Sequence, residues 1–364
     1  MAEARPPEMR RLARSVTART LLTLSVGVVG GGALGLTGFP AGYLSGSIVS
    51  VAAFALMGWP MVIPRRVAQV TFVIIGISIG AAVTPDTLNR VAAWPFSIAI
   101  LLLAMVAVTV SVMFYLQKVH RFDPLSALYA ASPGALSQTL AMAADTGADV
   151  RSIAIVQAAR QILLALLIPG IVRVIGYSQA PVMAERGVVS WQQNMQELAI
   201  LVIVSTLAAL LAQRLRVPGG LIVGAMIGSG GLHAGGLVSL NIPDSLAIAA
   251  FIALGALAGS RFAGTELRQL KETGLAAIGA VIVATLVVSV FALAAALMLA
   301  LPLGETIVAF APGALEVMTI LAFALHLDVA FVGTHHVIRF AFVSLGLPSA
   351  AALIRSRTSA STKD

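Results

Sequence analysis

Apolar stretches long enough to cross a lipid bilayer recur along almost the whole chain, and this feature constrains the fold more than any other. A helix needs about 20 mostly apolar residues to span roughly 30 Å of hydrocarbon. Hydrophobic residues make up 59% of the 364 residues and charged residues only 10%, which leaves little sequence for a water-soluble domain. The chain is therefore predicted to be an all-α, polytopic membrane protein. The ten predicted spans lie near residues 20–38, 41–63, 67–84, 93–116, 151–176, 196–213, 218–236, 245–260, 274–302 and 329–353.

Two further apolar stretches, 124–146 and 305–326, are interrupted by the same Pro-Gly-Ala-Leu motif, which begins at Pro133 and again at Pro312. Proline breaks the hydrogen bonding of a helix interior but is favoured in the first turn of a helix. Each motif is therefore predicted to end one short helix and to start another helix at the proline. An ordinary proline kink is the alternative for each motif.

The two halves of the chain repeat one another. Adding 179 to a residue number in the first half gives its match in the second half, and at the start of the second span of each half the shift is 178. The matches include Pro133 with Pro312, Gly134 with Gly313, Asp149 with Asp328, Arg160 with Arg339, Gly76 with Gly255, Gly80 with Gly259 and, at the smaller shift, Gly46 with Gly224. We therefore expect two homologous membrane repeats. The predicted segments are a basic tail at 1–19, repeat 1 at 20–176, a linker at 177–195, repeat 2 at 196–354 and a tail at 355–364.

Basic residues indicate that the two repeats have opposite orientations. The net charge is +8, and Lys and Arg concentrate in the cytoplasmic loops of membrane proteins. In the first repeat they cluster before the first span, at 65–66 and at 118–121, and in the second at 214–216, at 261–271 and in the tail. Placing every cluster in the cytoplasm requires five crossings per repeat, both termini inside, and two Pro-Gly helices that enter and leave on the same side. Inverted repeats with such broken, re-entrant helices are typical of secondary transporters.

Two arginines are predicted to lie near the bilayer centre, where a charge costs at least ~2.5–3.5 kcal/mol and usually serves a pathway or a partner. Arg160 and Arg339 each follow an aspartate by 11 residues, which places them about 16 Å further along a helix. Helix starts also bind anions through their unpaired N–H groups. We therefore expect both arginines and both breaks to bind one anion. The alternative is that each arginine pairs with a carboxylate or with carbonyl groups freed at its break and only stabilises the fold, and the two roles can coexist.

The residues around the two arginines differ between the repeats. Glu316 occupies the position that matches Ser137, and His336 the position that matches Gln157. Glutamate and histidine can change protonation state, which suits proton coupling, although a structural contact of Glu316 with Arg339 or His336 is the alternative. The predicted substrate-binding residues are Pro133, Gly134, Ser137, Gln138, Gln157, Arg160, Pro312, Gly313 and Arg339. The predicted coupling residues are Glu316, His335, His336, Asp149 and Asp328.

The stretches around the two motifs, 132–161 and 311–340, resemble the AbrB family of duplicated bacterial membrane proteins. The resemblance covers the chain apart from its two tails. It implies a multi-pass protein of the bacterial inner membrane, in a family whose members carry names such as ammonia monooxygenase or regulator of gene expression. In relatives a carboxylate often stands beside the first Pro-Gly motif, where this chain has Ser137-Gln138, so the resemblance does not extend to a cation site in repeat 1.

Several classes of function fit the sequence poorly. The chain has no cysteine and five histidines, and adjacent residues such as His335 and His336 point about 100° apart on a helix, which is unsuitable for one metal ion. We expect no enzyme, no metal site and no other cofactor. No P-loop motif is present, so a transporter would use a gradient. No nucleic-acid-binding module is recognisable.

The sequence therefore favours a secondary transporter that moves a small anion, in the first place a carboxylate, by alternating access between the inverted repeats with proton coupling. The expected partners are the lipid bilayer and the small anionic solute, with no nucleic acid, and a homo-oligomer is compatible with the pattern. The alternative is a membrane-embedded regulatory protein that affects gene expression without transport.

Overall fold

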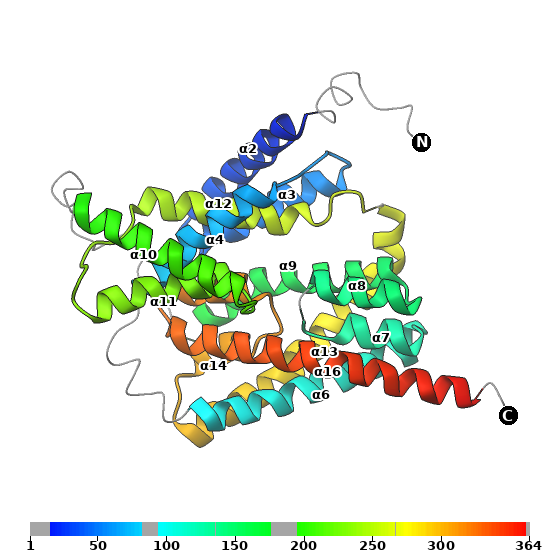
Figure 1. The fold of residues 1–364 in the computed structure, drawn as a ribbon. Coiled ribbons are helices and arrows are strands. Elements are labelled where there is room, and N and C mark those ends of the chain that lie inside the picture. Colours follow the sequence, from blue (N-terminus) through cyan, green and yellow to red (C-terminus); the bar gives the residue numbers. More distant parts are fainter. Residues whose placement is uncertain (1–14, 82–93, 135, 176–194, 266, 362–364) are drawn as a thin grey trace. The chain divides into compact units, whose positions relative to one another are not determined.

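The computed structural model describes residues 15–81, 94–134, 136–175, 195–265 and 267–361, and in these ranges every regular element is an α-helix (Figure 1). The predicted all-α class is confirmed. The helices are α2 (Val16–Gly35), α3 (Gly42–Leu56), α4 (Arg65–Gly80), α6 (Trp94–His120), α7 (Pro124–Ala131), α8 (Leu136–Thr146), α9 (Val150–Val174), α10 (Met195–Arg214), α11 (Gly220–Ala234), α12 (Asp244–Ser260), α13 (Leu267–Leu299), α14 (Leu303–Phe310), α15 (Leu315–Ala324) and α16 (Val329–Ser361).

Each of the ten predicted spans corresponds to a helix. Within the described ranges, six helices are long and apolar enough to cross a membrane. The six stretches are Val16–Gly35, Trp94–His120, Val150–Val172, Met195–Arg214, Lys271–Leu299 and Val329–Ser356. The other four predicted spans form shorter helices of 15 to 17 residues, namely α3, α4, α11 and α12. The chain is therefore a membrane-type helical protein, while the layout of ten inverted spans stays a prediction.

Both Pro-Gly motifs interrupt a helix, as predicted. The first motif separates α7 from α8, and the second separates α14 from α15. The prediction that the new helix starts at the proline is wrong, because α8 and α15 begin at Leu136 and Leu315, three residues later. The residue before a proline is driven into extended backbone, and Ser132 and Ala311 have ψ angles of 125° and 133°. Each short helix therefore ends in extended chain, so its last carbonyl groups accept no hydrogen bond from a following helical turn.

The described helices belong to two compact units, and each unit takes helices from both halves of the sequence. Unit 1 contains α2, α3, α4, α10, α11 and α12. Unit 2 contains α6, α7, α8 and α14, most of α9, α13 and α16, and the first half of α15. The two Pro-Gly motifs and both arginines fall in unit 2. Unit 2 is therefore the part of the molecule that holds the candidate site.

Unit 1 repeats its close helix contacts at the spacing of the sequence duplication. Glycines of α4 face carbonyl oxygens of α11, and the matching glycines of α12 face carbonyl oxygens of α3, so closely that a β-carbon would come within 2.5 to 2.7 Å of each oxygen. The four contacts are Gly76 with Ile222, Gly80 with Met226, Gly255 with Leu44 and Gly259 with Ile48. Glycine lets helix backbones approach this closely. The third helix of each half thus packs on the second helix of the other half, a reciprocal exchange that reflects the duplication.

Candidate functional site

Arg160 lies on α9 and binds the end of α7. Its side chain is only 4% exposed, and its Nη1 and Nη2 groups donate to the carbonyl oxygens of Ala131 and Ser132 at 3.2 and 3.0 Å. The last carbonyl groups of a helix have no donor within the helix, and the break at Pro133 leaves them without a following turn. The guanidinium group therefore caps the broken helix. The fold-stabilising role that the sequence left as an alternative is present in the structure.

Arg339 repeats this arrangement on α16. Its side chain is 3% exposed, and its Nη1 and Nη2 groups donate to the carbonyl oxygens of Ala311 and Gly313. Ala311 is the residue that matches Ser132 in the duplication, so one of the two hydrogen bonds has the same position in both halves. The duplicated arginines thus perform the same capping at both breaks.

Gln157 and His336 form a second pair of matched contacts, three residues before each arginine. Both side chains are completely buried. Gln157 Nε2 donates to the carbonyl oxygen of Tyr129 at 2.7 Å, and His336 Nε2 lies 3.0 Å from that of Val308. Since a carbonyl oxygen only accepts, the imidazole carries its proton on Nε2, and its Nδ1 remains an acceptor. The contact is shared, but an amide stands in one half and a titratable ring in the other.

Buried polar atoms without a hydrogen-bond partner gather at the two breaks. Among the described residues they include the Tyr129 hydroxyl, Ser132 Oγ, Gln157 Oε1, Arg160 Nε, His336 Nδ1 and Arg339 Nε. Such atoms are rare in folded proteins because each one costs about 1–3 kcal/mol. Their concentration in one part of unit 2 indicates a polar site that water or a ligand completes.

The charges of this site act on one another. Arg339 is near enough to Arg160 for the two positive charges to repel and near enough to Glu316 for attraction. His336 in turn is within the influence of Arg339 and His335. The hydrogen bonds described above join both guanidinium groups to neutral carbonyl oxygens, which cap the helices but do not neutralise the charge. Unit 2 therefore brings the two predicted counter-charges together with excess positive charge.

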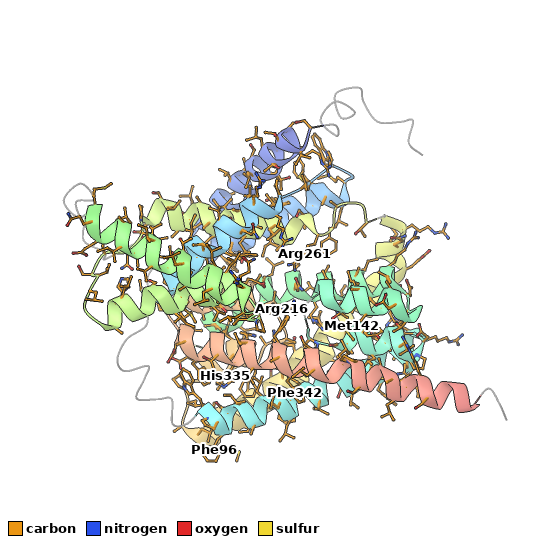
Figure 2. All side chains as sticks on the ribbon, viewed as in Figure 1. Phe96, Met142, Arg216, Arg261, His335 and Phe342 are labelled. Atoms are coloured by element: carbon orange, nitrogen blue, oxygen red, sulfur yellow. The ribbon has the colours of Figure 1, made fainter. Side chains whose placement is uncertain are left out.

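His335 lies in a different environment from its neighbour. Its ring is completely buried on the side of α16 that faces α6 (Figure 2). Nε2 lies 2.8 Å from Ser97 Oγ and Nδ1 lies 2.7 Å from the carbonyl oxygen of Phe331. The centroids of the Phe331 and His335 rings are 4.0 Å apart. The side-chain hydrogen bonds of the two adjacent histidines therefore reach different helices, α6 for His335 and α14 for His336, although the His335 ring also stacks on Phe310 of α14 with ring centroids 6.2 Å apart.

The two predicted aspartates lie at helix starts. Asp149 is exposed and accepts hydrogen bonds from the N–H groups of Arg151 and Ser152 at 3.1 and 3.2 Å and from the Ser152 hydroxyl at 2.6 Å. It therefore caps the N-terminus of α9. Asp328 is half-buried and directly precedes Val329, the first residue of α16. Their coupling role stays a prediction.

The remaining predicted residues surround the breaks. Pro133, Pro312 and Gly313 are buried, and Gly134 and Glu316 are half-buried. Ser137 and Gln138 lie on α8, but their side chains are outside the described residues. Sequence reasoning missed the hydroxyl groups of Tyr129 and Ser132 just before the first break. A tyrosine within an apolar stretch was the available signal, because its hydroxyl needs a partner when buried.

Long apolar helices, a duplicated contact pattern and two arginine-capped helix breaks define the class as an internally duplicated helical membrane protein. The chain belongs to the AbrB family, since the family described as "Transition state regulatory protein AbrB" matches residues 43–355. The family resemblance predicted from the two motif stretches is thereby confirmed.

Two relatives illustrate this similarity. The protein YhjN of Bacillus subtilis strain 168 is 25% identical over 360 residues, which cover 91% of this chain and 91% of that protein. A protein of Escherichia coli K12 named "Putative regulator AbrB" is 25% identical over 217 residues, 59% of this chain and 62% of that protein. The similarity to YhjN thus includes both halves of the duplication.

Proposed function

We propose that this protein is a secondary transporter that moves a small anion, in the first place a carboxylate, across the bacterial inner membrane. The observation that carries the proposal is the pair of buried arginines, one at each helix break. Both donate to neutral carbonyl groups and keep an Nε without a partner. A carboxylate accepts from such N–H groups in short, charge-assisted hydrogen bonds and also supplies the missing negative charge.

The buried positive charges of Arg160 and Arg339 need a compensating interaction. A single arginine within the hydrocarbon region costs at least ~2.5–3.5 kcal/mol, and two that repel each other cost more. Their hydrogen bonds to carbonyl groups recover part of this cost without removing the charge. An anion between the guanidinium groups compensates both at once, so the arrangement favours an anionic ligand over a cation or a neutral solute. Gln157, together with Ser137 and Gln138, would supply neutral hydrogen bonds to it.

Transport follows the inverted-repeat scheme in this proposal. The two repeats run in opposite directions with both termini in the cytoplasm, the Pro-Gly helices are re-entrant, and the repeats alternate between open states. The reciprocal packing of α4 on α11 and α12 on α3 supports two equivalent repeats. Glu316, His335, His336 and the two aspartates are the candidates for proton coupling. We expect neither enzymatic activity nor a cofactor.

A second candidate function rests on the family description, which contains the word regulatory, and on the name of the Escherichia coli relative, which contains the word regulator. In that case the protein would act on gene expression from the membrane without moving a solute. The two candidates differ in one measurable property, because a regulator without transport shows no flux when it is the only protein in a vesicle.

The test uses the purified full chain. We expect isothermal titration calorimetry and thermal-shift measurements with acetate, lactate, succinate and nitrate to detect binding, and proteoliposomes to accumulate the bound anion. Arg160→Gln and Arg339→Gln keep a donor for the carbonyl groups but remove the charge, so binding should disappear while the fold remains. Arg151→Gln, an exposed arginine on the same helix as Arg160, is the matched control. Unchanged binding in both charge variants would refute the anion site.

A further inference from the structure

We infer that Nδ1 of His336 is the proton-binding atom of the site and that it binds a proton only together with the anion. The inference rests on the anion site proposed above and assigns the coupling to one atom. It separates His336 from the other four residues that the sequence offers for coupling.

The geometry singles out this nitrogen. His336 is completely buried, and its Nε2 donates to the carbonyl oxygen of Val308. Nδ1 therefore holds a lone pair, and it has no hydrogen-bond partner among the described residues. Arg339 follows three residues later, which places the two side chains side by side on one helix face. The lone pair of one group and the unpartnered Nε–H of the other thus belong to the same polar site.

The surrounding charges make proton binding conditional. His335 and Arg339 act on His336 from its own helix, and the Val308 carbonyl oxygen contacts it from α14. Arg339 itself feels Arg160 from α9 and Glu316 from α15. A proton on Nδ1 would place a third positive charge beside two guanidinium groups in a buried site, where like charges repel strongly. A bound anion reverses this balance, because it adds negative charge and accepts the new N–H bond.

The two ligands are consequently linked. If the anion increases the affinity of His336 for a proton, the proton increases the affinity for the anion by the same factor. One proton leaves the solvent and binds the Nδ1 lone pair, and no other bond forms or breaks. Binding of the proton without the anion adds a third positive charge that nothing in the site compensates, whereas a bound anion offsets this charge and accepts the new N–H bond. A proton that binds only together with the solute is what a symporter requires.

Repeat 1 lacks this atom. Gln157 makes the matching contact, with Tyr129, but its Oε1 belongs to an amide, which does not bind a proton at ordinary pH. His335 has both nitrogens engaged, with Ser97 and Phe331. We therefore expect uptake of about one proton per bound anion, all of it in repeat 2.

The experiment measures proton uptake directly. The purified full chain is titrated with acetate by calorimetry near neutral pH, in two buffers of different ionisation enthalpy. We expect about one proton per bound acetate, and an acetate affinity that increases about tenfold for each pH unit of acidification while His336 is unprotonated in the free protein. Nitrate serves as a second probe because it does not titrate in this range, so a proton that enters with it must bind to the protein.

Two exchanges between the repeats make the assignment specific. His336→Gln introduces the residue that repeat 1 has naturally, so acetate binding should persist while proton uptake and the pH dependence disappear. Gln157→His should raise the uptake to about two protons. His233→Gln is the control, since His233 of unit 1 also carries an unpartnered nitrogen, Nε2, but is not part of the site.

The outcomes separate the two proposals. Proton uptake that persists in His336→Gln overturns the inference, as does acetate binding to the unmodified protein without any proton uptake, and in both cases the anion site stands. If neither acetate nor nitrate binds the unmodified protein, the anion site is wrong and the inference falls with it.

Discussion

At the first helix break Gln157 and Arg160 bind the carbonyl groups that end α7, and at the second His336 and Arg339 bind those that end α14. These four acceptors, Tyr129 and Ser132 in one half and Val308 and Ala311 in the other, occupy matched positions in the duplication, whereas the second acceptor of each arginine, Ala131 or Gly313, does not. The chemistry is different, because the second break adds a titratable ring and Glu316 where the first has amide and hydroxyl groups. What is identical in both breaks is therefore assigned to the fold, and what differs is assigned to function.

The strongest test of this comparison is removal of each arginine. Arg160→Ala and Arg339→Ala each leave two buried carbonyl groups without donors, and each such group costs about 1–3 kcal/mol. We expect similar losses in the free energy of unfolding for both variants, measured by denaturant titration in detergent micelles. Arg151→Ala should have almost no effect. A loss at one break alone would show that the two caps are not equivalent.

The glycine contacts of unit 1 test whether equivalence extends beyond the breaks. A methyl group on Gly76 would meet the Ile222 carbonyl oxygen and one on Gly255 the Leu44 carbonyl oxygen, each at 2.6 Å. We expect Gly76→Ala and Gly255→Ala to destabilise the protein by about 1–3 kcal/mol each, because the helices must separate. Gly274→Ala, where a β-carbon meets nothing within 4 Å, is the control. Clearly unequal losses would contradict a reciprocal packing of the two halves.

A smaller effect is expected from a contact that only the second half has. Ser97 and His335 are joined at 2.8 Å, whereas the residue that matches His335 in repeat 1 is the apolar Val156. Ser97→Ala should cost about 1 kcal/mol of stability and leave anion binding intact. A large loss of acetate affinity, measured by calorimetry, would instead place His335 within the site.

The smallest effect on stability concerns the first break. The Tyr129 hydroxyl is buried and has no partner among the described residues, so Tyr129→Phe removes a polar group that stabilises nothing. Its matching residue is Val308. Because water completes this polar site when no ligand is bound, we expect the free energy of unfolding, measured by denaturant titration, to change by less than about 1 kcal/mol. Substantial destabilisation would show that the hydroxyl has a structural partner.

Much of the architecture was predictable because it follows from patterns in the sequence alone. Hydropathy located ten of the helices, since a helix in lipid must cover its own backbone with enough apolar side chains. The constant offset revealed the duplication, and with it the matched arginines, without knowledge of any contact. The start of α8 and α15 was misplaced, because the extended residue before each proline depends on the geometry of the break itself.

The sequence by itself determined that the chain is helical, of membrane type, duplicated and interrupted at two Pro-Gly motifs, because hydropathy, offset and proline chemistry are properties that can be read from the chain without any contact. Only the tertiary structure decided which carbonyl groups the arginines cap, that His335 and His336 form hydrogen bonds with different helices, and that the third helix of each half packs on the other half. The capping contacts join residues 26 to 29 positions apart. Such contacts depend on how helices pack, and no local pattern specifies them.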